Sequence, residues 1–378
     1  MRRRFACLIA AAVFALGFAI AAARGEVVSW RASPADPGAI RARLKIDGRA
    51  IDINLHIAKP AAARSDATLL IEAGKSDALA YLTTTHGFTS ARVDLSQLPQ
   101  ELRGHAMRDT IAKLKQDSGA RYVLAHGDAD TSAFLAANAE LFDGLLLENA
   151  RDPASSRLTR VIVIFDREGL TRLKPEALNE KSAPANQRRF YLTATSLSAP
   201  STDPSCPAPV VDLSADPARR ALLVALEAWT RGVKPPASRF PAAADLAPAR
   251  MLTWPKIPDL PPPPADDQLM IKIDVDGNET AGLRLPDRAL PVATFVTFNA
   301  QRGASGKSCS RVTVLPFPVT RAARETNKDP RLSLVERYGS RAYYVATLRV
   351  VADRLVRERL LLPQDADAYV AAGKIAPF

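Results

Sequence analysis

The sequence predicts an α/β protein in which a mostly parallel central sheet carries helices on both faces. From residue 67 onward, short apolar runs typical of buried strands alternate with amphipathic stretches typical of helices. This alternation favours a parallel sheet that is covered on both sides. A stretch at 234–264, rich in proline and alanine, then connects this core to a C-terminal region with its own turn and helix patterns.

The first 23 residues have the pattern of a secretory signal peptide. Three arginines at 2–4 precede an apolar run at 5–23, and the alanines at 21–23 form a small-residue cleavage site. The run is also about long enough to span a bilayer, so a retained membrane anchor is the alternative. We expect cleavage, no membrane span in the mature chain, and a periplasmic or secreted location.

The formal net charge of +11 falls to +8 (11 − 3) once the three signal arginines are removed. Basic and acidic residues alternate along the chain, and no basic block is interleaved with aromatic residues. This pattern argues against a nucleic-acid partner and favours a solvated basic surface.

Two cysteines remain after export, Cys206 and Cys309. In an oxidising compartment such a pair is a candidate disulfide, and two free buried thiols are the alternative. The bridge would close a loop of about 100 residues, which the chain-entropy model values at up to roughly 4–5 kcal/mol.

The segment 24–66 is expected to be short and β-rich. Residues 42–46 and 51–55 alternate between apolar and polar, and Asp47-Gly48 between them has the composition of a tight turn. The α/β core is expected at 67–233, with a helix that Asp216-Pro217 opens and Gly232 ends. Its other strands are expected at 68–71, 88–93, 121–125, 145–147, 160–165 and 189–193, and its other helices at 107–115 and 131–141.

The C-terminal region, 265–378, is expected to add a hairpin and a helix. The arms 271–275 and 281–285 flank Asp276-Gly277, which favours a hairpin turn. Asp274, Asp276 and Asn278 also resemble the start of a calcium loop, but Leu285 stands where a bidentate glutamate belongs. One face of the helix should carry Tyr344, Leu348, Val351 and Leu355.

Residues 122–132 run from a strand through a tight turn into a helix, which is the layout of a nucleophile elbow. With Gly127 as the first glycine, Ala129 takes the serine position and Thr131 takes that of the last glycine. An alanine carries no nucleophile. Thr131 adds a branched side chain where close backbone approach is needed.

The histidines are a second test of the same site. In this layout the triad runs serine, then acid, then histidine. The chain has four histidines, His56, His86, His105 and His126, and all of them precede the turn. The usual general base is therefore missing from its usual place.

Three residues beside the turn are weak substitutes for the lost chemistry. Ser132 is a candidate nucleophile, and Asp128 or Asp130 could activate a water. Their alternative roles are capping and stabilising the helix that follows. A metal site on His126, Asp128 and Asp130 has little support because their spacing on one turn is so short, and no metal or cofactor is expected.

Three segments resemble the alpha/beta hydrolase domain family, a group of esterase-like proteins with a long C-terminal signature. The segment 127–135 with Phe142-Asp143-Gly144 is similar to G-Y-S-Q-S-G-R-F-L followed by F-D-G. The segment 220–238 is similar to R-A-L-x-x-A-L-x-x-W followed by P-P-x-S. The most specific likeness lies in D-G-N-E at 276–279, D-P-R at 329–331, E-R-Y at 336–338 and L-L-L-P at 360–363, and the whole covers about 67–375.

The resemblance implies an α/β-hydrolase fold and ancestral chemistry on carbonyl substrates. It places Leu197 or Ser198 at the histidine position, Asp166 or Glu168 at the acid position, and Gly74 near the oxyanion loop.

From the residues themselves, we expect the C-terminal Asp-Pro-Arg and Glu-Arg-Tyr segments to anchor the terminal helix by charge-assisted hydrogen bonds. Binding of a substrate carboxylate by Arg331 or Arg337 is the alternative.

The function predicted from the sequence is that of an inactive pseudo-hydrolase with a binding or structural role, whose pocket holds a small apolar or ester-like ligand. The alternative is an active esterase-like hydrolase that works through a rearranged site.

Overall fold

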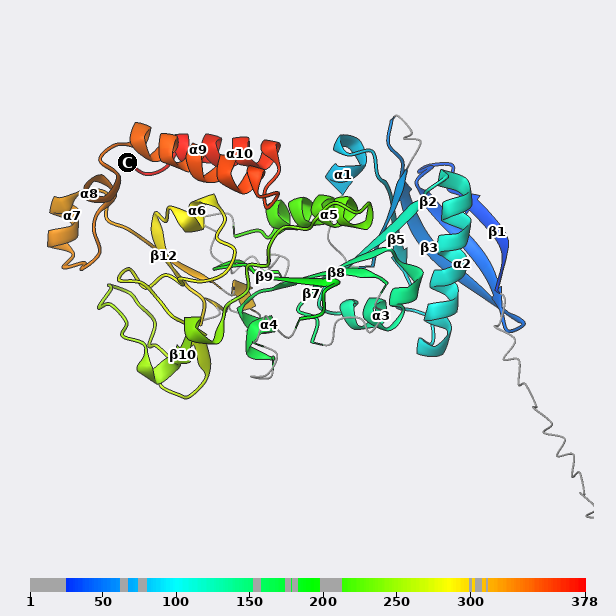
Figure 1. Cartoon of the computed structure of the whole chain (residues 1–378), viewed down its shortest axis with the longest axis horizontal. Coiled ribbons are helices and arrows are strands. Elements are labelled where there is room, and N and C mark those ends of the chain that lie inside the picture. Colours follow the sequence, from blue (N-terminus) through cyan, green and yellow to red (C-terminus); the bar gives the residue numbers. More distant parts are fainter. Residues whose placement is uncertain are drawn as a thin grey trace, which may run out of the picture.

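The computed structural model has a nine-stranded sheet at its centre (Figure 1). It describes residues 25–61, 67–73, 80–151, 158–173, 178, 183–197, 213–298, 301–302, 308–310 and 312–378. The strands lie in the order β1-β2-β3-β5-β4-β6-β7-β8-β9. Their bounds are β1 Glu26–Ala32, β2 Ala39–Ile46, β3 Arg49–Ala58, β4 Thr68–Glu72, β5 Thr89–Asp94, β6 Tyr122–Gly127, β7 Gly144–Glu148, β8 Arg160–Phe165 and β9 Gln187–Tyr191.

The sheet is antiparallel from β1 to β5 and parallel from β5 through β4 to β9. The parallel strands are buried on both faces, as the apolar runs of the sequence predict. The mostly parallel sheet with helices is therefore confirmed. The N-terminal β-rich segment supplies three strands of this same sheet.

Helices cover both faces of the sheet (Figure 1). On one face, α2, α3 and α4 pack against side chains such as Val123 and Ala125. On the other, α1, α5, α9 and α10 pack against side chains such as Leu124 and Leu146. The bounds are α1 Ala80–Thr85, α2 Gln100–Ser118, α3 Ser132–Ala137, η1 Ala139–Leu141, α4 Arg167–Thr171, α5 Asp216–Thr230, α9 Arg341–Arg357 and α10 Pro363–Lys374.

The N-terminal hairpin forms where the sequence predicts it. β2 and β3 pair through the turn Asp47-Gly48, whose φ angles are 49° and 77°. Two consecutive positive φ values are those of a type I′ turn, which matches the twist of the two strands.

The expected C-terminal hairpin forms, but only over 272–280, where the main-chain nitrogen of Thr280 donates to the oxygen of Lys272 and that of Asp274 donates to the oxygen of Asn278. Ile271 ends β11, which pairs with β10 from the proline-rich stretch, and a single bridge between Ile273 and Glu279 closes the turn. The second arm instead bridges to Leu192 at the end of the main sheet through Leu283. The arms diverge because the buried Glu279 side chain bonds to the main sheet through Tyr191.

The remaining elements belong to the C-terminal region and its connection. They are η4 Ala243–Asp245, β10 Leu246–Pro248, η5 Ala249–Met251, β11 Leu269–Ile271, α6 Pro286–Ala289, β12 Ala293–Val296, β13 Gln301–Arg302, β14 Ser308–Ser310, β15 Thr313–Pro316, α7 Arg321–Thr326 and α8 Leu334–Tyr338. On α9, Tyr344, Leu348 and Leu355 are buried as predicted, but Ala352 completes the face in place of Val351.

Two arginines lock the C-terminal region together. The guanidinium of Arg331 donates to Asp329 and to the main-chain oxygens of Leu315 and Pro316. The guanidinium of Arg337 donates to Asp276 over 2.7 Å. These charge-assisted bonds tie the Asp-Pro-Arg and Glu-Arg-Tyr segments to β15 and to Asp276, and none of the bonds named here reaches α9, so the predicted anchoring of the terminal helix is not what they do. The bonds of Arg331 leave its guanidinium little capacity for a substrate carboxylate.

Neither the disulfide nor the oxyanion candidate can be placed. Gly74, Ser198 and Cys206 lie outside the described residues, and so does the side chain of Cys309. The disulfide therefore stays a prediction. No helix among the described residues combines the length and the apolar character needed to cross a membrane.

Candidate active site

The candidate site lies at the carboxyl ends of the parallel strands, where ligands bind in open α/β sheets. On the face covered by α5, the apolar rows of β4, β6 and β7 end in Glu72, His126 and Glu148. All three side chains are buried. Ionisable groups are rarely buried without a partner, so this row marks a place where the sheet holds charge.

The turn after β6 is relaxed. The carboxylate of Asp128 accepts hydrogen bonds from the main-chain nitrogens of Asp130 and Thr131 and from the Thr131 hydroxyl. Ala129 is exposed, and it is not among the described non-glycine residues that have a positive φ. The strained geometry that presents a nucleophile is therefore absent at Ala129.

Gly127 keeps one feature of an elbow. A Cβ atom added there would lie 2.7 Å from Leu135 Cδ1 and 3.2 Å from the main chain of Ser132. The end of β6 therefore approaches the following helix as closely as only glycine permits.

The Ser132 hydroxyl both donates and accepts a hydrogen bond within the fold. Its Oγ donates to the carbonyl oxygen of Gly127 over 2.9 Å and accepts from the main-chain nitrogen of Glu148 over 3.0 Å. The residue is 1% exposed. The hydroxyl thus ties the turn to β7, and its proton is directed at a carbonyl oxygen and away from any base.

His126, Glu148 and Arg219 form a buried charge network. Glu148 Oε1 lies 2.8 Å from His126 Nε2 and 2.6 Å from Arg219 Nε, and Arg219 Nη2 reaches Glu148 Oε2 over 3.0 Å. Burial alone would raise the pKa of Glu148, but hydrogen bonds and charge from His126 and Arg219 lower this pKa overall. The imidazole of His126 is thus held by a carboxylate on the sheet, and among the described residues it pairs with no serine.

Asp166 lies beside the position that the resemblance assigns to histidine. Its Oδ1 accepts from Asn149 Nδ2 and from the main-chain nitrogen of Gly169, each over 3.0 Å. Its Oδ2 accepts from the main-chain nitrogen of Leu197 over 3.2 Å. The Asp166 carboxylate therefore accepts a hydrogen bond from the main chain of Leu197, where an active triad would have an imidazole.

The other candidates lie apart from this network. Glu168 is on α4 and pairs with Arg172 at the surface. His56 lies on the exposed N-terminal hairpin, 3.4 Å from Asp36. Among the described residues, no three histidine, cysteine or acidic side chains are grouped as metal ligands, so His126, Asp128 and Asp130 do not assemble as one.

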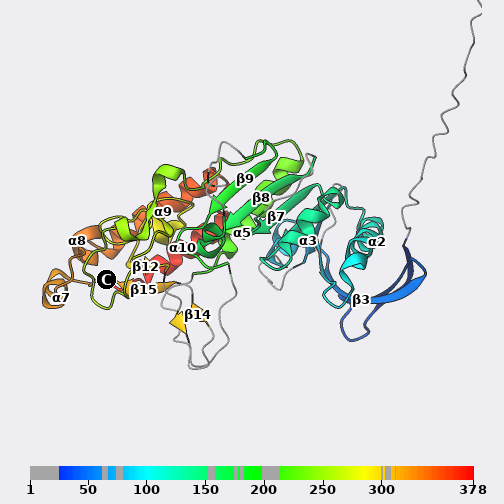
Figure 2. The same cartoon turned by 90° about the horizontal axis from the view of Figure 1, so that it is seen from below.

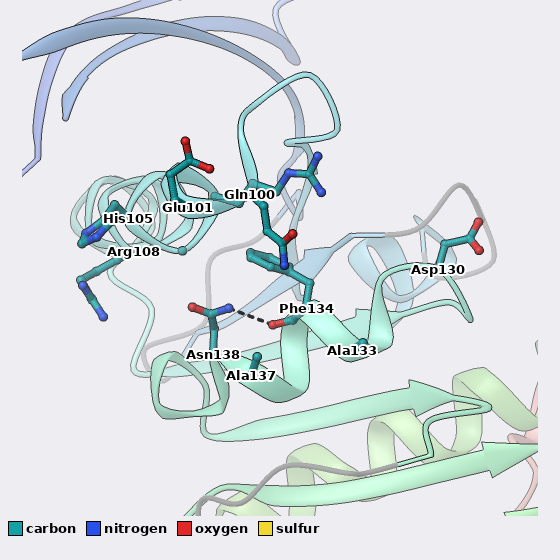
Figure 3. Close-up of a pocket in the computed structure, with 11 residues that line it drawn as sticks. Gln100, Glu101, His105, Arg108, Asp130, Ala133, Phe134, Ala137 and Asn138 are labelled. Carbon is teal, nitrogen blue, oxygen red and sulfur yellow. Dashed lines mark hydrogen bonds between the residues drawn. The ribbon is translucent and has the colours of Figure 1, made fainter. Parts of the chain in front are cut away.

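Asp130 faces a separate cavity. A hollow of about 550 Å³ lies between α2 and α3, with Asp130 and Phe134 on one side and Glu101, His105 and Arg108 on the other (Figure 3). The residues that line it include none of the buried charge network. This hollow is on the face of the sheet opposite α5, because α2 and α3 pack there.

Glu148 and Arg219 were not identified as site residues from the sequence. A weak signal exists, because Glu148 ends the otherwise apolar strand segment Gly-Leu-Leu-Leu-Glu. Nothing in the sequence pairs it with an arginine 71 positions further on.

Comparison with known proteins agrees with this architecture. A family model described as an alpha/beta hydrolase domain matches residues 176–371. The comparison with curated proteins returned no match.

Similar solved structures are α/β serine hydrolases and esterases. The α/β serine hydrolase XC6422 from Xanthomonas campestris is 11% identical, with 43% of this chain and 85% of that chain covered and a TM-score of 0.30. A cold-adapted esterase from an Arctic intertidal metagenomic library is 14% identical, with 43% and 88% covered and a TM-score of 0.31. The family match spans more than half of the sequence, and the chain belongs to the alpha/beta hydrolase domain family.

Proposed function

We propose that the chain is an exported, catalytically inactive member of this family, which keeps the hydrolase scaffold for a binding or structural role. The observation that carries the proposal is the state of Ser132. Its hydroxyl is buried and bonded at both ends, to Gly127 and to Glu148. A serine becomes a nucleophile only when a base takes its proton, and here the proton is donated to a carbonyl oxygen.

Two further observations support this proposal. The exposed side chain of Ala129 is a methyl group. The acid Asp166 bonds to the backbone of Leu197, so the step from acid to imidazole is missing as well. In this proposal, an alanine stands at the nucleophile position, the Ser132 hydroxyl is used in structural hydrogen bonds, and the acid contacts a main-chain nitrogen where a histidine would be.

The cavity between α2 and α3 is the place we assign to a small ligand. Its volume of about 550 Å³ is within the range of small-molecule sites. Phe134 offers an apolar surface there, and Glu101, Arg108 and Asp130 offer polar contacts. An apolar or ester-like ligand with one polar end would match this lining.

A fluorophosphonate probe tests the inactive state, because it labels serines that a neighbouring base activates. We expect no labelling of the purified protein. Labelling that is lost in Ser132→Ala would establish the rearranged esterase site instead. Ester hydrolysis that is lost in Asp130→Asn or Asp128→Asn, without any labelling, would establish a water-based site. Export is tested separately, by mass spectrometry for loss of the first 23 residues.

A further inference from the structure

A second hollow, of about 660 Å³, is lined by residues of β1, β2 and β3. These strands lie at the end of the molecule far from the C-terminal helices (Figure 2). Side chains alternate along these strands. Ala42, Leu44 and Ile53 face the core, whereas Arg41 and Arg43 are exposed. The hollow is therefore lined largely by the polar, outward face of the N-terminal strands.

Two arginines of this face lie directly opposite each other. Arg31 on β1 is the register partner of Arg41 on β2. Like charges at such a position repel, because their Cβ atoms are only about 4.5–5.5 Å apart. Within the part of the chain that the structure describes, neither guanidinium has a carboxylate at ion-pair distance.

The one carboxylate that lines the hollow is already neutralised. Asp52 accepts two hydrogen bonds from Arg43, over 2.7 and 2.8 Å. Asp52 also attracts Arg41 at longer range. One carboxylate thus faces three arginines, Arg31, Arg41 and Arg43, and a net positive charge remains at this place. Asn54, the register partner of Arg41 on β3, extends the two arginines into a row of donors across three strands.

We propose that the row Arg31–Arg41–Asn54 binds a ligand through a phosphate group. A guanidinium donates two parallel hydrogen bonds to a phosphate. A phosphate monoester carries a charge of about −1.5 to −2 at pH 7, so one such group neutralises both arginines, whereas a carboxylate neutralises only one. The phosphate belongs either to a small soluble ligand or to a lipid headgroup, and this site is independent of the inactive strand-end site.

The test is titration of the purified protein with inorganic phosphate by calorimetry, together with sedimentation on vesicles that contain phosphatidic acid, a phosphate monoester, and on phosphatidylcholine vesicles as the background. Arg31→Gln and Arg41→Gln remove the row. Lys45→Gln is the matched control, since Lys45 is exposed on β2 but does not line the hollow.

We expect Arg31→Gln and Arg41→Gln each to weaken binding about tenfold or more, as the loss of a charge-assisted bond implies. Lys45→Gln should bind like the parent. Binding of free phosphate identifies a soluble ligand, and binding only to vesicles that contain phosphatidic acid identifies a lipid headgroup. If neither probe binds, or if Lys45→Gln weakens binding as much as Arg31→Gln, the proposal is overturned. The thermal midpoint of Arg31→Gln should equal or exceed that of the parent, because repulsion is relieved, and a lower midpoint would contradict the premise.

Discussion

Replacing Arg219 tests the buried charge network in depth. In Arg219→Leu, the carboxylate of Glu148 loses the bonds from Nε at 2.6 Å and from Nη2 at 3.0 Å. Glu148 is 1% exposed, so water cannot replace these bonds. Removing one partner of a buried ion pair costs about 3–5 kcal/mol of stability, because the other charge is left uncompensated. We expect a loss of this size in the free energy of unfolding.

Urea unfolding followed by intrinsic tryptophan fluorescence, to which Trp229 on the same helix contributes, measures this loss. Two further variants make the result specific. Arg250→Leu removes an exposed ion pair with Asp267 and should cost about 1 kcal/mol or less. The double variant Glu148→Leu/Arg219→Leu should be more stable than Arg219→Leu, because no buried charge is left unpaired. If Arg219→Leu is no less stable than Arg250→Leu, the network does not hold the strand ends together.

Three other predictions concern Ser132, Gly127 and Glu279. Ser132→Ala should cost about 1–3 kcal/mol in urea unfolding, because the buried main-chain nitrogen of Glu148 loses its acceptor. Gly127→Ala should lower the thermal midpoint, because the new Cβ would lie 2.7 Å from Leu135 Cδ1 and 3.2 Å from the main chain of Ser132. Burial raises the pKa of Glu279 above 4.5, so the native state binds more protons than the unfolded chain there, and stability is lost as pH rises through the raised pKa. Glu279→Gln should therefore gain stability relative to the parent as pH rises from acidic to neutral, and a thermal midpoint difference that does not change with pH would contradict this.

The sequence predicts the core strands well, because parallel strands that are buried on both faces consist of consecutive apolar residues. β8 occupies Arg160–Phe165, the same residues as expected. Short helices such as α1 and α4 were missed, because five or six residues do not complete two helical turns and show no clear period. The C-terminal hairpin is shorter than expected, because the composition of a turn does not show that a residue far along the chain, Tyr191, bonds to Glu279.

The candidate site, too, could be predicted from the sequence only in part. The family motifs led to Asp166 or Glu168 as the acid position and to Leu197 or Ser198 as the histidine position, and the structure joins Asp166 to Leu197 by one hydrogen bond. The partnership of Glu148 with Arg219 depends on how α5 packs against β7, which no local pattern encodes. The bonds that occupy Ser132 depend on β7 as well, since Glu148 supplies the second of them.

The central claim, that Ser132, His126, Glu148 and Asp166 at the described strand ends are all bonded within the fold, is tested most directly by the hydrolysis of an activated short-chain ester. The rate is measured for the purified protein, for Asp166→Asn and for a heat-denatured sample. We expect the three rates to be equal, and Ala129→Ser to add nothing, because no imidazole is positioned to take the new proton. A saturable rate in the parent that Asp166→Asn abolishes would show that a working triad exists, and the account would be wrong.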